Sequence, residues 1–398
     1  MLLHFSARIG LPDMPLKLPI YLDNAATTRV DPRVVEAMLP YLTERYGNAA
    51  SGTHSFGRAA ARAVDEARGE VAALLNADAS EVVWTSGATE SNNLAIKGAA
   101  AANERRGRHL VTLETEHKAV LDTMKTLEAH GYTVTYVAPE PDGLVDPIKF
   151  GAALRSDTVL ASVMLVNNEI GVIQDVAALG TLCRERDILF HVDAAQATGK
   201  VAIDLKRLPI ELMSLTAHKT YGPKGIGALY VRGAPRPRID AQMHGGGHEQ
   251  GLRSGTLPTH QIVAIGAAFR IAGEEMATEV PRLRALRDRL WRQLGDLPGV
   301  AINGSMKERI ANNLNISLEL ERGASLMASL TDIAVSATAA CDSGSVSHVL
   351  QALGRDAALA GNSIRLTVGR FNTEEEIDYA AAYLRQKIED CRGGRRAA

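Results

Sequence analysis

The sequence predicts an α/β protein whose large domain contains a mainly parallel seven-stranded sheet, followed by a smaller α/β domain. Short apolar runs alternate with stretches of helical periodicity, which is typical of a parallel sheet covered by helices. A longer helical pattern then runs from His260 to about Leu294. At 398 residues the chain is long enough to bury two cores.

Seven apolar runs predict the strands of the large sheet. Ile226–Val231 is expected to be antiparallel, and the other six runs are expected to end near Thr85, Thr112, Val137, Val166, Val192 and Leu215. Apolar residues at helical spacing predict helices over residues 57–75, 91–105 and 176–186. The helical stretch 260–294 is expected to connect the two domains.

The composition argues against several classes of function. With 44 Lys and Arg against 46 Asp and Glu, the net charge of -2 gives no electrostatic basis for direct nucleic-acid binding. No window approaches the ~20 apolar residues of a membrane span, and the N-terminus is too mixed for a signal peptide. Three cysteines without a Cys-x-x-Cys pair predict a reducing, cytoplasmic location. Three glycines separate His244 from His248, so no metal site is expected.

Lys219 and Asp193 are the residues that most directly indicate a chemistry. Asp193 follows the buried strand predicted at 188–192, and Lys219 follows a second apolar stretch, so both are expected at the ligand-binding edge of the sheet. An amine can bind an aldehyde cofactor covalently, and a carboxylate can keep a pyridine nitrogen protonated. The pair therefore suggests a pyridoxal phosphate (PLP) enzyme. A solvated lysine and a strand-end aspartate remain an alternative on these two residues alone.

The segment Ser86–Asn93 follows a predicted strand, breaks at Gly87 and opens a helix. Such a turn presents unpaired backbone N–H groups to an anion. A plain capping box, with Ser86 or Thr89 as the N-cap, predicts the same local shape without a phosphate, so both interpretations stay open.

The three cysteines have different sequence environments. Cys183 has helical apolar spacing and is expected in the core, whereas Cys391 is expected in a disordered tail. Cys341 lies in a segment of small residues, 336–345, where a flexible loop would suit a mobile nucleophile. An inert loop cysteine is the alternative.

Motifs from about Ile20 to Tyr379 resemble those of the cysteine desulfurase family and occur in the family's order. They are Tyr21–Thr28, Ser86–Asn93, Thr115–Val120, Val166–Gly171, His191–Gln196, Ala217–Lys219, Gly245–Glu249 and Arg253–Thr256. The resemblance implies a PLP-dependent transferase of fold type I. It also implies a large PLP-binding domain over 29–275, and a small domain formed by 14–28 and 276–398 that carries the catalytic cysteine.

The resemblance implies roles for individual residues. Lys219 would bind the cofactor, Asp193 would pair with the pyridine nitrogen, and His117 would stack on the ring and move protons. Arg365 would bind the substrate carboxylate with help from Asn168, and Cys341 would form a persulfide. The other implied cofactor contacts are Asn168 and Gln196 near the ring hydroxyl, Ala88, Thr89, Thr216 and His218 at the phosphate, and Thr256 from the second subunit of a homodimer.

The implied reaction converts L-cysteine to L-alanine and leaves a persulfide on Cys341 for transfer to a sulfur-acceptor protein. Selenocysteine cleavage or transamination on the same fold is one alternative, and a non-catalytic docking platform is another. Only the role of Cys341 separates desulfuration from the other PLP reactions.

Two departures from the family pattern bear on the sulfur acceptor. Around Cys341 the chain has Ala337, Thr338, Ala339 and Asp342 where the family has Ser, Gly, Ser and Thr, and the segment is about two residues shorter. A stiffer backbone and a neighbouring carboxylate predict a slower cysteine that depends on a partner protein.

The chain also lacks the longer C-terminal tail with which iron–sulfur members dock their scaffold. This puts that partnership in doubt and leaves thionucleoside synthesis or DNA phosphorothioation open. Met14 is a candidate start, since the resemblance begins after it.

Overall fold

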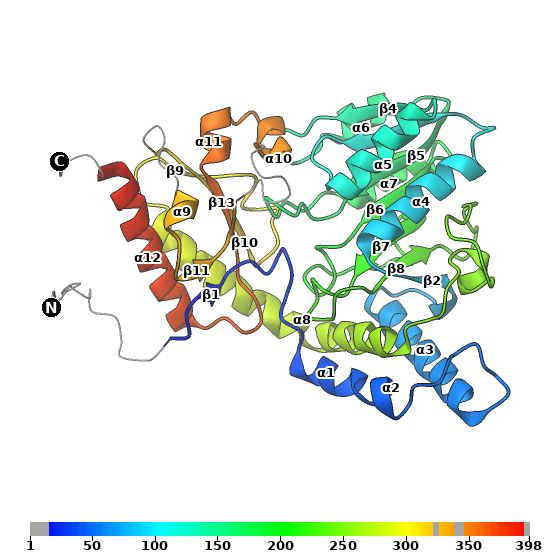
Figure 1. Cartoon of the computed structure of the whole chain (residues 1–398). Helices are drawn as coiled ribbons and strands as arrows, with labels where there is room; N and C mark the ends of the chain where they lie inside the picture. The colour runs from blue at the N-terminus through cyan, green and yellow to red at the C-terminus, as the bar shows by residue number, and fades with distance from the viewer. Residues whose placement is uncertain (1–15, 321–325, 338–345, 394–398) are drawn as a thin grey trace.

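The computed structural model describes residues 16–320, 326–337 and 346–393. Its larger sheet has seven strands in the order β2-β8-β7-β6-β5-β3-β4 (Figure 1). Strand β8 is antiparallel to β2 and β7, and the other pairs are parallel, which confirms the predicted sheet. The strands are β2 (Val82–Thr85), β3 (His109–Leu113), β4 (Thr133–Val137), β5 (Thr158–Met164), β6 (Leu189–Asp193), β7 (Leu212–Thr216) and β8 (Gly227–Val231).

Helices bury both faces of this sheet. Neighbouring strand residues alternate between two cores: Leu110 and Leu160 pack in one, Val111 and Ala161 in the other. One face is covered by α4 (Ala88–Ala102) and α5 (Lys118–Ala129), and the other by α3 (Ser55–Leu74), α6 (Pro147–Ala153), α7 (Val176–Arg184) and part of α8 (Thr259–Leu294). A parallel sheet needs such two-sided cover, which explains why its strands read as continuous apolar runs.

A second, four-stranded antiparallel sheet has the order β12-β13-β10-β9. Its strands are β9 (Val300–Ile302), β10 (Asn313–Leu318), β12 (Ser336–Ala337) and β13 (Ser363–Thr367). The N-terminal β1 (Ile20–Tyr21) pairs with β11 (Ile333–Ala334), so the start of the chain packs in the same core. The remaining elements are α1 (Pro32–Met38), α2 (Pro40–Thr43), α9 (Leu326–Ser329), α10 (His348–Ala352), α11 (Ala357–Gly361), α12 (Glu374–Gly393) and two 3-10 turns, Ala79–Glu81 and Glu249–Gly251.

Helix α8 joins the two cores as one continuous helix, as the periodicity of 260–294 predicts. Its first half places Ile262 and Phe269 in the core of the large sheet, whereas its second half places Leu286 and Leu290 in the core of the small sheet. Both sheets therefore pack against the same helix. The residue boundaries of the two predicted domains stay a prediction.

Helix α12 corrects the interpretation of Cys391. That residue was expected in a disordered tail, but it lies in the last turn of α12 and packs, partly buried, against the small core. The apolar stripe of Leu384 and Ile388 continues to Cys391 three residues on, so the same face stays inward. The prediction for Cys183 is confirmed, because it is fully buried in α7.

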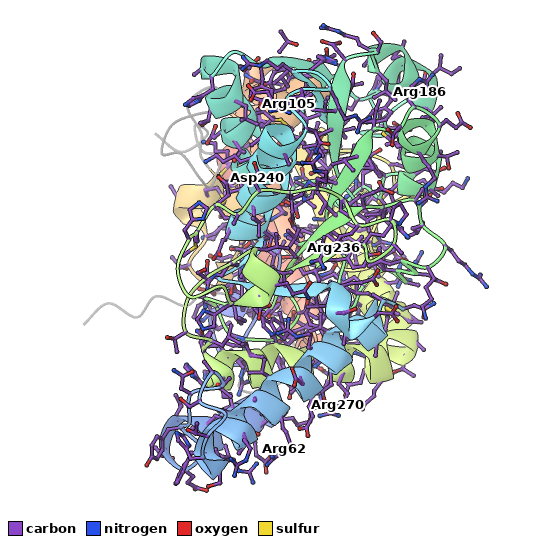
Figure 2. The ribbon with its side chains drawn as sticks, turned by 90° about the vertical axis from the view of Figure 1, so that its right-hand side faces the viewer. Arg62, Arg105, Arg186, Arg236, Asp240 and Arg270 are labelled. Atoms are coloured by element: carbon purple, nitrogen blue, oxygen red, sulfur yellow. The ribbon has the colours of Figure 1, made fainter. Side chains whose placement is uncertain are left out.

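Figure 2 shows the face of the molecule on which Arg105, Arg186, Arg236 and Asp240 lie. A groove of about 980 Å³ runs beside the amino ends of β6 and β7, lined by side chains of both charges. Parallel α/β sheets bind their ligands at the opposite, carboxyl edge. Within the described residues, no helix has the length and apolar character needed to cross a membrane.

We expect Leu290→Ala to lower the free energy of unfolding by about 2–5 kcal/mol, the usual cost of a leucine-sized cavity. Leu290 is fully buried in the small core. Chemical denaturation followed by circular dichroism measures the change. Arg284→Ala on the exposed face of the same helix is the control and should stay within about 0.5 kcal/mol of the unchanged protein. Equal effects of the two substitutions would contradict the assignment of α8 to this core.

Candidate active site

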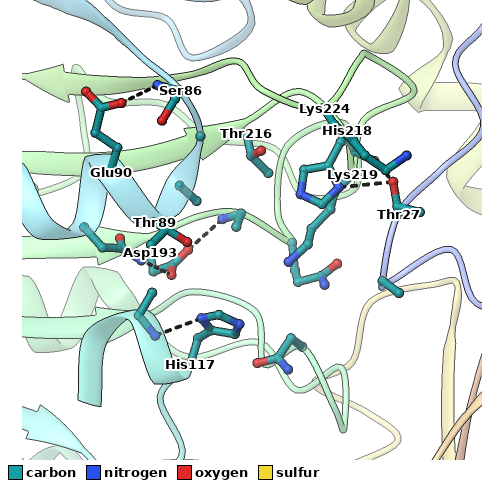
Figure 3. Close-up of a pocket in the computed structure, with 18 of the residues that line it drawn as sticks. Thr27, Ser86, Thr89, Glu90, His117, Asp193, Thr216, His218, Lys219 and Lys224 are labelled. Atoms are coloured by element: carbon teal, nitrogen blue, oxygen red, sulfur yellow. Dashed lines mark hydrogen bonds between the residues drawn. The ribbon is translucent and has the colours of Figure 1, made fainter. Parts of the chain in front are cut away.

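A pocket of about 530 Å³ lies at the carboxyl ends of β5, β6 and β7 (Figure 3). The side chains of Lys219, Asp193 and His117 point into the same space. The expected edge of the sheet is therefore where the site residues meet. Nine of the sequence-predicted residues line this pocket: Ala88, Thr89, His117, Asn168, Asp193, Gln196, Thr216, His218 and Lys219. Their individual roles stay predictions.

Asp193 ends β6 and is held by two donors. The Asn92 side chain donates from Nδ2 to Oδ2 at 2.7 Å, and the Ala195 amide donates to Oδ1 at 2.9 Å. Both bonds are buried, so the carboxylate has one fixed orientation. Each oxygen keeps a lone pair for a further donor in the pocket. Asn92 lies inside the Ser86–Asn93 motif, but no role was predicted for it.

The turn between β2 and α4 forms a candidate anion cradle. Gly87 is the N-cap and adopts φ 151°, a region that favours glycine, and the structure gives this cap no side-chain hydrogen bond among the described residues. The capping-box interpretation with Ser86 or Thr89 is therefore wrong. Instead, the Ser86 amide donates to Glu90 Oε2 at 2.7 Å. The first amides of α4, at Ala88 and Thr89, stay available to an anion.

Thr216 ends β7, and the connection after this strand carries His218 and Lys219. Thr28 fixes it by donating from both its amide (2.8 Å) and its Oγ1 (3.0 Å) to the His218 carbonyl oxygen. Burial, followed by the neighbouring Lys219, Lys224 and Lys200, lowers the pKa of His218 to about 4. The ring is therefore neutral at neutral pH, and it can donate one hydrogen bond without adding charge.

His117 is the N-cap of α5, and its Nδ1 accepts from the Ala119 amide at 3.1 Å. Because Nδ1 accepts, the neutral ring carries its proton on Nε2. Burial, and next the charge of Lys219, lower the pKa of His117 below its ordinary value. The imidazole is thus held neutral, in one tautomer and against one wall of the pocket.

Glu116, beside His117, is a buried acid that the sequence analysis did not identify. Its Oε1 accepts from the Met164 amide at 2.6 Å, and Oε2 has no partner within the described part of the chain. Burial raises the pKa of Glu116 well above its usual range; the Met164 bond opposes this shift, and Asp193 adds to it. A neutral carboxylic acid therefore lies close to the Asp193 carboxylate.

Arg365 reaches the rim of the pocket from β13. Its Nη1 donates to the Asn168 carbonyl oxygen at 2.8 Å and its Nη2 to Asp23 Oδ1 at 2.9 Å, while the buried Nε has no partner among the described residues. An unpaired buried donor is costly, so this guanidinium suits a further acceptor such as a carboxylate. Thr256, in contrast, is exposed and is not among the residues that line the pocket.

Cys341 lies outside the described residues, as does Met14. The described residues on either side of the cysteine segment are bonded to the loops beside the pocket. Ser336 Oγ donates to Asp23 Oδ1 at 2.8 Å, and Ser347 Oγ donates to Glu169 Oε2 at 2.5 Å. Both ends of the segment are thus fixed next to Arg365 and Asn168.

Residues 20–380 match the family Aminotransferase class-V. The cysteine desulfurase IscS of Methylobacillus flagellatus is 62% identical over 378 residues, which cover 94% of this chain and 93% of that protein. Among solved structures, a NifS-like protein superposes with a TM-score of 0.87 at 38% identity, over 94% of this chain and 100% of that chain. SspA in complex with cysteine gives 0.80 at 37% identity, over 89% and 100% respectively.

These likenesses cover nearly the whole chain and confirm the resemblance drawn from the order of the motifs. Since both the large sheet and the pocket lie within the matched residues, the chain belongs to the class-V aminotransferases and, among them, to the cysteine desulfurases.

Proposed function

We propose that the chain uses PLP to convert L-cysteine to L-alanine and retains the sulfur as a persulfide on Cys341. The observation that carries this proposal is the meeting of Lys219, Asp193 and the uncapped start of α4 in one pocket. The relatives named cysteine desulfurase and the SspA structure with bound cysteine support the choice of substrate.

The residues present fit the cofactor. The amides of Ala88 and Thr89, with the Thr216 hydroxyl and the neutral His218, offer donors to a phosphate. Asp193 offers a fixed carboxylate to the ring nitrogen. Lys219 would bind the aldehyde, Gln196 and Asn168 would contact the ring hydroxyl, and His117 would cover one ring face. When bound, PLP supplies an aromatic ring that withdraws electrons from the substrate amino acid.

The chain's own groups account for substrate binding and proton transfer. Arg365 binds the substrate carboxylate with its guanidinium group, which its bonds to the Asn168 carbonyl oxygen and to Asp23 hold beside the pocket. Lys219, as a neutral amine, removes the proton from Cα. The neutral His117 can donate a hydrogen bond only through Nε2, and it takes up a proton at Nδ1 only by releasing the Ala119 amide.

The sulfur step requires a thiolate on Cys341. It attacks the substrate sulfur, so an S–S bond forms while the bond between Cβ and sulfur breaks, and Cβ gains a proton. L-Cysteine and one thiol thus give L-alanine and one persulfide, with no external oxidant. Selenocysteine cleavage and transamination do not need this thiol. The joint presence of Lys219, Asp193, His117 and Arg365 argues against a docking platform.

We propose further that the chain acts as a homodimer and passes its sulfur to an acceptor protein. Large apolar side chains are exposed along α1, α2 and the start of α3, which Figure 1 shows at one end of the molecule. Exposed apolar side chains gathered on neighbouring elements are typical of an interaction surface. Its members are Val35, Leu39, Leu42, Tyr46 and Phe56. The exposed Thr256 would then complete the phosphate site of the second subunit.

Cys341→Ala should abolish the formation of alanine and sulfide from cysteine in the presence of a reductant, while the visible absorption band of the bound cofactor stays. Lys219→Ala should remove that band. Cys391→Ala, remote from the pocket, is the control and should keep full turnover. Alanine formation by the Cys341 variant would instead favour a lyase that needs no protein thiol, and a keto acid from cysteine would favour an aminotransferase.

The turnover of cysteine should persist below about pH 6.5, the ordinary pKa of histidine, and fall only at lower pH. The lowered pKa keeps His117 neutral down to that range, and protonation then breaks its hydrogen bond with Ala119. His117→Gln should reduce kcat on the order of 100-fold. His130→Gln, at the exposed end of the same helix, is the control. A His117 variant with an unchanged rate and pH profile would contradict the role.

Leu42→Glu should shift the protein toward monomers in analytical ultracentrifugation, because it places a charge inside the proposed apolar interface. The unchanged protein should have twice the chain mass of 42.5 kDa. Ile148→Glu, also at an exposed apolar residue but on α6, is the control and should remain dimeric. A monomeric unchanged protein at micromolar concentration would refute the homodimer.

A further inference from the structure

Lys200 is a partly buried lysine that lines a small cavity together with Lys219, and it is outside the set of residues assigned to the reaction. It follows the turn after β6, and its Nζ donates to three oxygens: Gln196 O (3.2 Å), Gln196 Oε1 (3.4 Å) and Lys219 O (3.2 Å). All three acceptors are carbonyl oxygens. The ammonium group thus connects the segment that carries Gln196 to the main chain of Lys219.

The first consequence concerns the orientation of the Gln196 amide. Gln196 Nε2 donates to the Ala25 carbonyl oxygen at 2.8 Å, and Oε1 accepts from Lys200. One end of the amide therefore meets an acceptor and the other end meets a donor. This arrangement fixes which end carries the nitrogen and leaves its second N–H for the pocket that Gln196 lines.

The second consequence is electrostatic. Burial, and next the charge of Lys219, lower the pKa of Lys200 to about 7, while Glu279 opposes this shift. Glu279 does not neutralise Lys200, because its two oxygens accept from Arg370 at 2.8 and 3.0 Å. Lys200, Lys219, Glu279, Arg370 and Tyr221 line one small cavity behind the pocket. Lys200 and Lys219 therefore disfavour each other's protonation.

We propose that Lys200 is a positioning residue, which orients the Gln196 amide and favours the uncharged form of the Lys219 side-chain amine. Only an uncharged amine can bind an aldehyde or accept a proton from substrate. This inference rests on the proposed role of Lys219 and adds a cause for its reactivity. Two substitutions separate the two effects: Lys200→Met removes the charge and the donor, whereas Lys200→Gln removes the charge and keeps an amide donor.

The first experiment uses the full chain freed of cofactor. An amine-reactive acetylating ester is added at a series of pH values, and the acetylation rate of Lys219 is measured by mass spectrometry of its peptide. Near pH 6, where Lys200 is charged, both substitutions should slow Lys219 acetylation on the order of tenfold, the effect of one pKa unit. The rates should converge above about pH 9, where the pKa of about 7 leaves Lys200 neutral.

Lys200→Arg, if it folds, should retain the fast rate at every pH. Lys125→Met, on the exposed face of α5, is the control and should not change the profile. Thermal unfolding selects the variants that fold, and one folded charge-removing variant is enough for the test. Identical Lys219 profiles in that variant and in the unchanged protein would overturn the electrostatic part of the proposal.

The second experiment uses the holoenzyme. The pH at which the visible band of the bound cofactor changes should rise by about one unit in both charge-removing variants, because a neighbouring cation no longer opposes protonation. Lys200→Met alone should also weaken cofactor retention during dialysis, since Gln196 loses its orientation. Equal retention in the two variants would overturn the positioning part. If the unchanged protein binds no cofactor, the proposed function fails, while the acetylation profiles still decide the role of Lys200.

Discussion

The hydrogen bond from Asn92 to Asp193 is the interaction on which the geometry of the site depends. Asn92 lies one turn after Ala88 and Thr89 on α4, so the helix that offers amides to an anion also holds the carboxylate at the end of β6. The separation between the anion cradle and Asp193 is thereby set by one turn of helix and one buried bond of 2.7 Å. A rigid two-ended ligand, with an anionic group and a basic ring nitrogen, matches such a site.

The small sheet contributes the residues on the substrate side. Arg365 on β13 bonds the Asn168 carbonyl oxygen, and Asn313 and Asn315 on β10 bond the carbonyl oxygen of Glu169. The loop between β5 and α7 therefore continues from the large sheet and is hydrogen-bonded to the small sheet. Helix α8 packs in the cores of both sheets. A movement of the small sheet would displace Arg365 and this loop together.

The strand ends and the residues at the edge of the sheet could be predicted from the sequence. The reason is that strands of a parallel sheet are buried on both faces and therefore consist of continuous apolar runs. Sequence reasoning failed where the deciding factor was local geometry or long-range packing. Gly87, and not Ser86 or Thr89, is the N-cap of α4, where the backbone adopts a φ of 151° that suits glycine. Glu116 and Lys200 could not be identified, because their buried environments are formed by segments distant in sequence.

Burial decides which groups of the pocket carry charge. It keeps the imidazoles of His117 and His218 neutral and raises the pKa of the Glu116 carboxyl, so these side chains act as hydrogen-bonding groups. Asp193 differs in its surroundings, because two donors turn toward its oxygens and fix the orientation of its carboxyl group. Cations lie near His218, where the charges of Lys219, Lys224 and Lys200 lower the pKa of the ring. An anion is therefore attracted toward the cations near His218 and repelled by the Asp193 carboxylate. A ligand with one anionic end is thus favoured in one orientation in the pocket.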